Sequence, residues 1–474
     1  METAQFDFGI IGVGVMGSNL LLNLADHGFK VLGYDKNKEK THLLEQSARP
    51  GTTIKGVNTI PEMMDLLAKP RKIMFLVPAG KIVDDVINDL LPFVDDGDIL
   101  VDGGNSHYTD TLRRITYLQD KKIHFVGAGI SGGEEGARTG PSIMPGGDEE
   151  AYRRLEPLFV SVAASVDNVP CVAYLGKDAA GHYVKMVHNG IEYAIMQLIS
   201  EVYDLLKNVG GLSNSELAQV FADWNQGELQ SFLVEITAHI FKEADDKTSG
   251  SLVDMILDKA GAKGTGKWTS QDALDISVPI PCIDAAVTMR NISSLKDQRV
   301  KASALYPIER QTQDVNKAEL IKELHDALLF AVIASYAQGL NMLSVASVHL
   351  NMQIDMLRVI NVWKGGCIIR SSLLKVFELA YSSDPNLQNL FLHPDIAEII
   401  LRTQGSVRTA VSKGIQAGLP MGAMTSGLYY FDAFRAERLP VNLVQAQRDF
   451  FGAHTYERID QPGVFHTEWN VVKP

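Results

Sequence analysis

The sequence predicts an α/β Rossmann domain followed by a large all-α domain and a C-terminal tail. Short β-rich runs alternate with helical patterns up to about residue 175, and long helical patterns then dominate to about residue 437. A glycine motif, GVGVMG (12–17), follows the first apolar run and opens a helical one, as the dinucleotide-binding turn of a doubly wound sheet does. We therefore expect a dinucleotide-binding domain at 1–178, a helical substrate and dimerisation domain at 179–437, and a tail at 438–474.

Five strands and two helices account for the N-terminal alternation. The expected strands are FGIIGVG (8–14), KVLGYD (30–35), KIMFLV (72–77), DILVDGG (98–104) and HFVGAGI (124–130). The expected helices are NLLLNLADHG (19–28) and KIVDDVINDLLPFV (81–94). Strands that alternate with helices in this way are typical of a parallel sheet.

The helical region contains one internal similarity and one strongly apolar segment. Residues 217–233 resemble 356–373, with Trp224 and Trp363 in register, which indicates a duplicated helical unit. The apolar stretch at 327–348 is interrupted by polar residues and glycine, so we expect a buried helix and no membrane span. Beyond Pro440 we expect a short helix at 441–452 and then an irregular end that reaches a partner subunit.

Composition excludes several classes of protein. The chain has 474 residues, 46% of them hydrophobic and 21% charged, as in soluble globular proteins. Its net charge of −13 argues against a nucleic-acid partner, and any anionic substrate needs local cations. The three cysteines, Cys171, Cys282 and Cys367, are far apart, which argues against a disulfide framework or a zinc site and fits a cytoplasmic protein. The first residues lack the basic start of a signal peptide.

The glycine motif predicts a dinucleotide site made by Gly12, Gly14, Val15, Met16 and Gly17. Glycine permits the tight turn, the close approach of a pyrophosphate and the packing of helix on strand. The pyrophosphate would lie at a helix N-terminus, where N–H groups and the helix dipole favour an anion. The alternative is a glycine-rich turn without a ligand.

The end of the second strand, Asp35-Lys36-Asn37, is where cofactor selection is expected. An acid there can accept a hydrogen bond from the ribose 2′-hydroxyl of NAD and repel the 2′-phosphate of NADP, and a lysine can do the opposite. The alternative is a simple turn, which this tripeptide also suits.

Two glycine-containing loops follow later strands and suggest ligand contacts. They carry Asn105 in DGGNS (102–106), and Ser131, Gly132 and Gly133 in SGGE (131–134). Both would lie at the carboxyl ends of parallel strands, where open sheets bind ligands. Tight turns without a ligand are the alternative.

The segment AGAKGTGKWT (260–269) nearly matches a P-loop. Trp268 replaces the magnesium-binding hydroxyl, and the preceding LVDMILDKA (252–260) reads as a helix where a P-loop needs a strand, so an NTPase is rejected. Lys263, Thr265 and Lys267 still suit a phosphate monoester. A basic surface loop is the alternative.

The segment KMVHNGIEY (185–193) places Lys185, His188, Asn189 and Glu192 on one face of a helix, beside a separate apolar stripe. Lys185 and Glu192 lie roughly 10 Å apart along the axis, so they could act on different atoms of a sugar-sized substrate. Gly190 costs about 1 kcal/mol relative to Ala inside a helix, which suggests that something approaches the backbone closely. The alternative is an ordinary solvated face.

Seven motifs in this order resemble the 6-phosphogluconate dehydrogenase family over nearly the whole chain. They are GVGVMGSNL, LVDGGNSHYTDT, GISGGEEGARTGPSIMPGG, GHYVKMVHNGIEY, KAGAKGTGKWT, GGCIIRS and QAQRDFFGAHTYE. The resemblance implies oxidative decarboxylation of 6-phospho-D-gluconate to D-ribulose 5-phosphate and CO2, in the pentose phosphate pathway and gluconate utilisation. It also implies NADP or NAD as cofactor, no metal, and a homodimer whose tails complete the partner's site.

The same resemblance implies residue roles. Lys185 would be the general base for the C3 hydroxyl, and Glu192 would protonate C1 of the enediol left by the loss of CO2. The implied substrate contacts are Asn105, Ser131, Gly132, Gly133, His188, Asn189, Tyr193, Lys263, Thr265, Arg290, Arg448 and His454. Val77, Ala79 and Asn105 would join the cofactor site.

Two departures from the family pattern bear on the cofactor. Asp35-Lys36-Asn37 stands where the family usually has Asn-Arg-Thr, and Ala79 lies in a segment that often carries Lys. We therefore expect NAD to be used at least as well as NADP. One alternative function is another β-hydroxyacid dehydrogenase of the 3-hydroxyisobutyrate type, which lacks the second half of the helical region and the tail. The other is a non-catalytic dinucleotide sensor, in which Lys185 or Glu192 would be dispensable.

Overall fold

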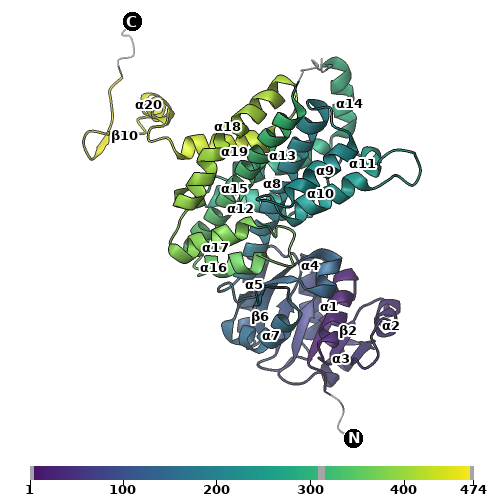
Figure 1. Ribbon diagram of the computed structural model, residues 1–474. Helices are drawn as coiled ribbons and strands as arrows, with labels where there is room; N and C mark the ends of the chain where they lie inside the picture. The colour runs from purple at the N-terminus through teal and green to yellow at the C-terminus, as the bar shows by residue number, and fades with distance from the viewer. Residues whose placement is uncertain (1–4, 308–314, 470–474) are drawn as a thin grey trace. The chain divides into compact units, whose positions relative to one another are not determined.

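The computed structural model describes residues 5–307 and 315–469, so the first four residues, residues 308–314 and the last five residues of the predicted domains lie outside it (Figure 1). The chain divides into two compact units, Met1–Gly427 and Leu428–Pro474, each described by itself below. The predicted division at 178 and 437 stays a prediction.

A seven-stranded sheet organises the N-terminal part of the larger unit, in the order β3-β2-β1-β4-β5-β6-β7. The strands are β1 (Phe8–Ile11), β2 (Val31–Tyr34), β3 (Ile54–Val57), β4 (Lys72–Phe75), β5 (Ile99–Asp102), β6 (His124–Ser131) and β7 (Ser142–Gly147). The strands from β3 to β6 pair in parallel, and β7 is antiparallel to β6. The α/β fold and all five predicted strands are confirmed. The sequence missed β3 and β7, because each contains glycine, and β7 also contains Pro145, both of which weaken a strand signal.

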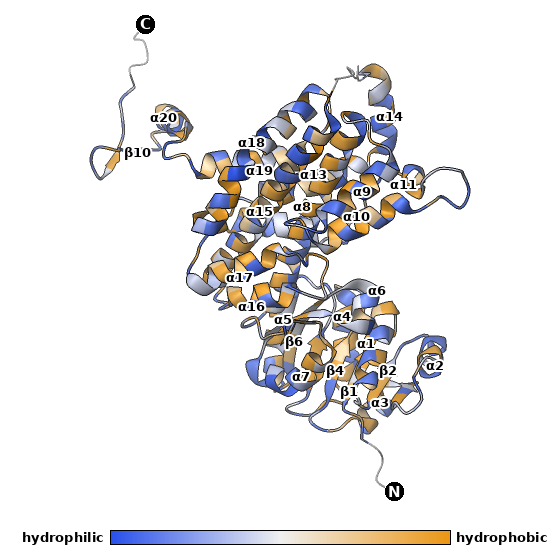
Figure 2. Cartoon of the chain, viewed as in Figure 1, coloured by the Kyte–Doolittle hydropathy of each residue, from blue (hydrophilic) through white to orange (hydrophobic). Residues whose placement is uncertain are grey.

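Helices cover both faces of this sheet. They are α1 (Val15–Asp26), α2 (Lys38–Gln46), α3 (Ile60–Leu66), α4 (Lys81–Leu90), α5 (Tyr108–Gln119), α6 (Gly133–Thr139) and α7 (Glu149–Val162), followed by the small hairpin β8 (Ser165–Val166) and β9 (Val169–Pro170). Neighbouring strand residues enter different cores: Ile10 packs with α1 and α7, and Ile11 packs with α3 and α4. A sheet buried on both faces needs strands that are mostly apolar, as β1 and the part of β4 after Lys72 are (Figure 2).

The rest of the larger unit is helical, as predicted. Its helices are α8 (Ala180–Asn208), α9 (Asn214–Trp224), α10 (Phe232–Lys242), α11 (Leu252–Met255), α12 (Thr265–Asp275), α13 (Pro281–Ser293), α14 (Lys296–Leu305), α15 (Lys317–His349), α16 (Met356–Trp363), α17 (Leu373–Ser383), η1 (Leu390–Leu392), α18 (Pro394–Gln416) and α19 (Gly422–Phe434), the last of which continues into the second unit. By length and composition, α15 alone among the described residues could cross a membrane, but 83% of its most apolar window is buried inside the protein. The prediction of a buried helix there is confirmed.

The predicted helix at 252–260 is mostly wrong. Only Leu252–Met255 is helical, and the chain then runs irregularly to Gly264. The apolar residues Met255, Ile256 and Leu257 are all more than half exposed, so no core face holds this segment in a helix.

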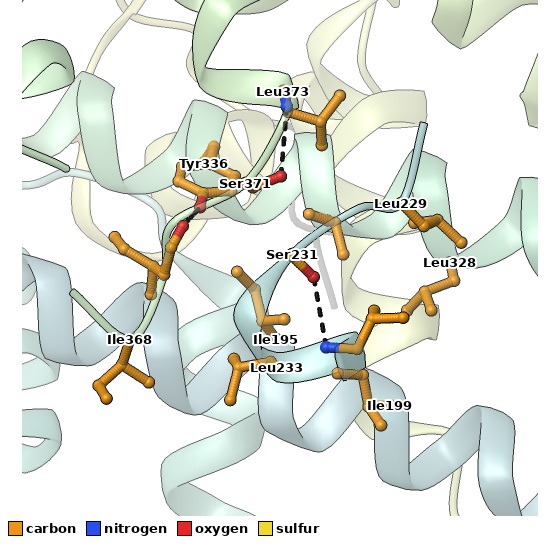
Figure 3. A pocket seen from close by; sticks show the side chains of 13 residues that line it. Ile195, Ile199, Leu229, Ser231, Leu233, Leu328, Tyr336, Ile368, Ser371 and Leu373 are labelled. Atoms are coloured by element: carbon orange, nitrogen blue, oxygen red, sulfur yellow. Dashed lines mark hydrogen bonds between the residues drawn. The ribbon is translucent and has the colours of Figure 1, made fainter. Parts of the chain in front are cut away.

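The two similar helical segments meet at equivalent positions. Trp224 ends α9 and Trp363 ends α16, and the loops that follow pair through an antiparallel bridge between Ser231 and Ser371. Figure 3 shows both serines beside an apolar cavity under this bridge, with room for about one water molecule. This arrangement is what a duplicated helical unit would produce.

Side chains of two long helices cap the first turns of two other helices. Gln338 of α15 accepts a hydrogen bond from the backbone N–H of Cys282 at the start of α13. Glu201 of α8 accepts hydrogen bonds from the N–H groups of Ala423 and Met424 at the start of α19. Each long helix therefore satisfies backbone N–H groups at the start of another helix.

The smaller unit contains the predicted helix, α20 (Val441–Gly452), and a short hairpin of β10 (Tyr456–Glu457) and β11 (Val464–Phe465). Asp449 of α20 holds the unit together. Its carboxylate accepts hydrogen bonds from the N–H groups of Thr455 and Thr467 and from the Trp469 indole, and it pairs with His466.

Candidate active site

The polar face of α8 is buried. Lys185, His188 and Asn189 are at most 8% exposed, and the side chain of Glu192 is 20% exposed. The alternative of a solvated face is therefore excluded. Polar side chains buried together on one helix face require hydrogen-bond partners or a ligand, because burying an unpaired polar group costs free energy.

Glycines let α8 lie directly on the sheet. A Cβ atom at Gly129 of β6 would lie 2.3 Å from Cβ of Lys185, and one at Gly127 would lie 2.9 Å from Nδ1 of His182. Gly190 has the same kind of role on the other side of α8, because a Cβ there would lie 2.9 Å from Cγ2 of Thr269 on α12. The close approach inferred from Gly190 is thus made by a neighbouring helix.

A chain of hydrogen bonds orients the polar face. Asn189 donates from Nδ2 to Oγ1 of Thr265, at 3.1 Å, so its Oδ1 faces His188 Nδ1 at 3.0 Å. Nδ1 of His188 must then carry the proton, which leaves Nε2 to accept from the Ser131 hydroxyl at 3.4 Å. The ring of His188 also packs edge-on against Trp363. Ser131, His188, Asn189 and Thr265 therefore form one connected group.

Burial prepares an acid and a base on this face. It lowers the pKa of Lys185, although the Glu192 carboxylate and Cys367 oppose this effect. It raises the pKa of Glu192, against the opposing influence of Lys185 and Arg290. Burial, reinforced by Lys185, holds the pKa of His188 well below its usual value, so its ring is neutral. A lysine with lowered pKa can serve as a base, and a glutamate with raised pKa can serve as an acid.

The predicted phosphate-binding residues come together beside this face. The guanidinium of Arg290 on α13 lies 3.6 Å from the ring centroid of Tyr193 and donates to the carbonyl of Gly261 at 2.6 Å. Thr265 is the first residue of α12, and Lys263 is exposed in the loop before it. This loop therefore joins Arg290 to the α8 face, and its lysine remains available to an anion.

The two glycine loops differ in their role. Asn105 is exposed at the carboxyl edge of the sheet, where a ligand can reach it. Gly132 has φ +118°, and a Cβ there would lie 2.6 Å from the carbonyl oxygen of Gly366, so glycine is needed for packing. Gly133 has φ +63° with open space around it, which leaves its backbone approachable.

The first βα turn fits a dinucleotide. A Cβ at Gly12 would collide with the backbone of Leu76 after β4, and one at Gly17 would collide with the carbonyl of Gly12, whereas Gly14 faces open space. Gly14 caps α1 without a side-chain hydrogen bond, and the first turn of α1 contains no acid, unlike the first turns of α2, α3, α4 and α5. These features leave the helix N-terminus open to the negative charge of a pyrophosphate. Val15, which follows Gly14, is 58% exposed.

Asp35 follows β2 as predicted, and its carboxylate already has partners. Oδ1 accepts from the N–H of Asn37 at 2.9 Å, and Oδ2 pairs with Nζ of Lys40 at 3.3 Å. Asn37 caps α2 by accepting from the N–H of Glu39. Lys36 is exposed, as are Lys38 and Lys40. Val77 and Ala79, by contrast, lie in the loop after β4.

Arg448 and His454 belong to the smaller unit. Both are exposed; Arg448 donates to the Gln445 side chain at 3.0 Å, and the His454 ring packs against Phe451. Their predicted contact with a partner's substrate stays a prediction.

The sequence analysis missed a buried carboxylate at the side of the site. Asp272 of α12 accepts short hydrogen bonds from the hydroxyls of Tyr108 on α5 and Tyr183 on α8. It ties α12, the helix that carries Thr265, to α5 beside the sheet and to α8. The three residues are far apart in sequence and form no local pattern, so only the fold brings them together.

Comparisons with known proteins agree with this geometry. Residues 7–176 match the NAD binding domain of 6-phosphogluconate dehydrogenase, and residues 181–469 match the C-terminal domain of 6-phosphogluconate dehydrogenase. The chain is 50% identical to the NADP(+)-dependent, decarboxylating 6-phosphogluconate dehydrogenase of Bacillus subtilis, over 97% of this chain and 98% of that protein. It is 48% identical to decarboxylating 6-phosphogluconate dehydrogenase 1 of Spinacia oleracea, over 97% of each. The structure of Plasmodium falciparum 6-phosphogluconate dehydrogenase, described in apo form and with NADP+ or 6-phosphogluconate, superposes with a TM-score of 0.95 at 41% identity and covers 98% of this chain and 100% of that one.

Proposed function

The chain belongs to the 6-phosphogluconate dehydrogenase family, and we propose that the buried face of α8 performs the family's reaction through Lys185 and Glu192. The protein is an oxidoreductase that converts 6-phospho-D-gluconate to D-ribulose 5-phosphate and CO2 and binds NADP. The observation that supports these roles is the opposed shift of the two pKa values on one buried helix face. The similarity extends over the whole helical region, which argues against an enzyme of the 3-hydroxyisobutyrate type.

Lys185 is the base of the oxidation step. NADP, when bound, accepts the hydride that leaves C3 of the substrate. Neutral Lys185 takes the proton of the C3 hydroxyl as the carbonyl forms, and its lowered pKa keeps it neutral more often than a surface lysine. The product is a β-keto acid, which loses CO2 readily, and protonated Lys185 then returns its proton to the carbonyl oxygen. The bond between C2 and the carboxylate carbon C1 breaks, and its electron pair moves into an enediol whose C1 is the former C2 of the substrate.

Glu192 completes the reaction. It lies two turns further along α8, so it can act on C1 of the enediol, the former C2 of the substrate, while Lys185 acts at the neighbouring C3. Its raised pKa favours the protonated form that can deliver a proton to C1. His188 is neutral and hydrogen-bonded on both nitrogens, which suits positioning more than proton transfer.

The remaining contacts orient the substrate. Ser131, Gly132, Gly133 and Asn105 bind the carboxylate end from the sheet edge, together with His188 and Asn189. Tyr193, Lys263, Thr265 and Arg290 bind the phosphate end, where two cations offset its charge. These assignments place the substrate along the face of α8, with its reacting carbons between Lys185 and Glu192.

We propose that NAD is used at least as well as NADP. Asp35 retains lone pairs for the ribose hydroxyls of NAD, and Lys36 is a looser phosphate partner than an arginine would be. The pairing of Asp35 with Lys40 offsets part of the repulsion that a 2′-phosphate meets, which supports use of NADP as well. Asp35→Asn combined with Lys36→Arg should shift the kcat/KM ratio towards NADP by about tenfold, or about 1.4 kcal/mol. A wild type that strongly prefers NADP would refute this role of Asp35.

We also propose a cytoplasmic homodimer in which the tail completes the partner's site. Arg448 and His454 are exposed in a unit whose apolar residues Phe450 and Phe451 are more than half exposed, so the unit has surface left for a partner. Mixed dimers of Arg448→Ala and Lys185→Met subunits should regain activity, up to about half of the sites per dimer. No regain would place the tail on the site of its own chain.

The central experiment is Lys185→Met. Turnover of 6-phosphogluconate, followed by reduced-nicotinamide absorbance, should fall to a few per cent or less, while substrate and NADP binding persist. Lys207→Met is the matched control, because Lys207 lies on the same helix but in its last turn, where it pairs with Asp254. A Lys185→Met variant that keeps substantial turnover would place the base elsewhere, and a wild type that does not reduce the dinucleotide would favour the sensor.

A further inference from the structure

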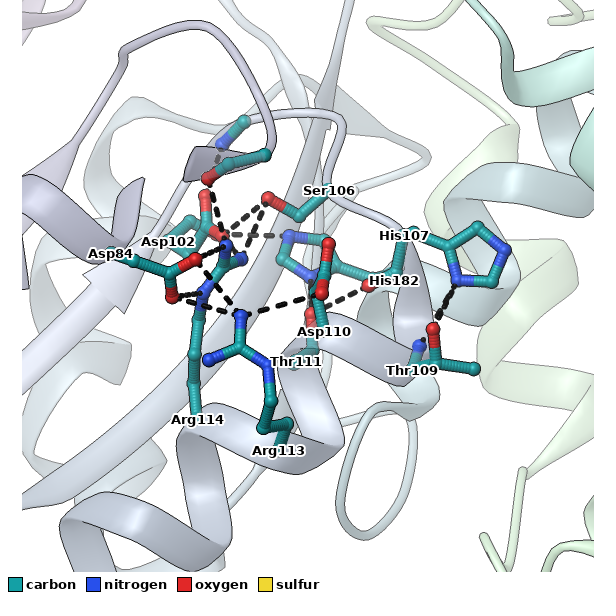
Figure 4. A network of polar contacts seen from close by, with 12 residues as sticks. Asp84, Asp102, Ser106, His107, Thr109, Asp110, Thr111, Arg113, Arg114 and His182 are labelled. Carbon is teal, nitrogen blue, oxygen red and sulfur yellow. Dashed lines mark hydrogen bonds and ion pairs between the residues drawn. The ribbon is translucent and has the colours of Figure 1, made fainter. Parts of the chain in front are cut away.

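A buried guanidinium joins two loops at the carboxyl edge of the sheet (Figure 4). The side chain of Arg114, on α5, is 1% exposed. It donates from Nε to Asp84 Oδ1 at 2.8 Å and from one terminal nitrogen to the carbonyl of Gly80 at 2.9 Å. The other terminal nitrogen lies 3.4 Å from both Asp102 Oδ2 and Ser106 Oγ.

These contacts hold two loops that flank the cofactor site. Gly80 ends the loop after β4, which also contains Val77 and Ala79, and Asp84 lies in the first turn of α4. Asp102 and Ser106 bracket the loop after β5, which carries Asn105. The Asp102 carboxylate braces this loop from inside by accepting from the N–H of Gly104 at 3.0 Å and from the Ser106 hydroxyl at 2.6 Å.

The same cluster reaches the catalytic helix. His182 of α8 has Nε2 3.1 Å from the backbone carbonyl of Asp102 and Nδ1 2.7 Å from the Thr111 hydroxyl. His182 lies about one turn before Lys185. Its contact with the Asp102 carbonyl therefore holds the loop that carries Asn105 against α8, close to the proposed base.

We propose that Arg114 is a positioning residue for hydride transfer, an inference that rests on the proposed function. A fully buried cation is costly unless its donors are paired, and only the rigid fork of arginine can reach Gly80, Asp84 and Asp102 together. Arg114 thereby fixes the loop that would hold the nicotinamide half of the dinucleotide against the loop and helix that hold the substrate. Hydride transfer needs reacting atoms about 3–3.5 Å apart, and a 1 Å misplacement can cost about 100-fold in rate.

The test compares Arg114→Lys with Arg113→Met. Arg113 is adjacent on α5 and pairs with the same Asp84 at 2.9 Å, but it is 55% exposed and reaches neither loop. For Arg114→Lys we expect kcat per folded molecule to fall by about 100-fold, with the KM for 6-phosphogluconate within about threefold of wild type. The primary isotope effect with substrate deuterated at C3 should rise, because hydride transfer becomes slower than the other steps. Arg113→Met should change neither quantity by more than about twofold.

The inference is overturned if Arg114→Lys keeps wild-type kcat and isotope effect, or if kcat falls with no rise in the isotope effect. If Arg114→Lys does not fold, Asp84→Asn weakens the contacts of Arg114 at their more exposed end. The kcat and the isotope effect of that variant then test the inference in the same way. A failure of the proposed function would be distinct, because the wild-type protein itself would then not oxidise 6-phosphogluconate.

Discussion

Replacing Gly129 with alanine should disable the enzyme through one added methyl group. The new Cβ would lie 2.3 Å from Cβ and 2.7 Å from Cγ of Lys185, and ordinary contact begins near 3.4 Å. Neither side can yield cheaply, because Gly129 pairs with Met144 inside the sheet and the Lys185 Cβ is fixed to the backbone of α8. The helix must therefore move by about 1 Å from β6, which carries the base away from the substrate's C3 hydroxyl.

The expected cost has two parts. Overpacking of this kind typically destabilises a fold by about 1–3 kcal/mol. A displacement of about 1 Å at the reacting groups costs about 100-fold in kcat, equivalent to about 2.7 kcal/mol of barrier. The assay is kcat at saturating 6-phosphogluconate and dinucleotide, divided by the folded fraction from circular dichroism at the same temperature.

Gly9→Ala is the matched control. Its new Cβ would lie 2.4 Å from an atom, but that atom is the terminal methyl of Met63, a flexible side chain that can move. We expect a small loss of stability and kcat within about twofold of wild type. If Gly129→Ala kept kcat at the level of Gly9→Ala, the reasoning that α8 is held against β6 at Lys185 would be wrong.

Three further changes test other parts of the structure. In Gly14→Ala the added Cβ meets no atom within 4 Å, so the stability of the protein without cofactor should not change. The affinity for NADP, measured by titration, should fall about tenfold or more, because the added methyl group keeps the pyrophosphate from approaching the turn. Unchanged affinity would exclude this turn as the cofactor site. Glu192→Gln should slow the release of ribulose 5-phosphate and solvent-hydrogen exchange at C1. Because the Glu192 carboxylate raises the pKa of Lys185, this change should also move the acid limb of the kcat profile, where Lys185 becomes protonated, to lower pH; a limb that moves to higher pH would contradict the coupling. Asp449→Ala leaves the donors of Thr455 and Trp469 unpaired, so proteolysis should cut the tail faster than the rest of the chain, and equal rates would contradict its structural role.

Local patterns allowed much of the fold to be predicted. The alternation of apolar runs and helices indicated the parallel sheet, because hydrophobic periodicity reflects burial within a few residues. The helix at 441–452 and the polar face at 185–192 also depend only on spacing along the chain. Strand β7 was missed because proline and glycine are uncommon inside strands and weaken the sequence signal, although β7 pairs with β6 over six residues.

The sequence by itself determined which chemical groups the protein carries and which helix presents them. Only the tertiary structure decided their state, because pKa values and positions depend on neighbours that are distant in the chain. Lys185 has a lowered pKa because the fold buries it, and it can lie where it does because Gly129, in a strand more than fifty residues earlier, lacks a side chain. Arg114 is likewise held in position by hydrogen bonds to Gly80, Asp84 and Asp102. No local sequence pattern predicts that these residues lie together.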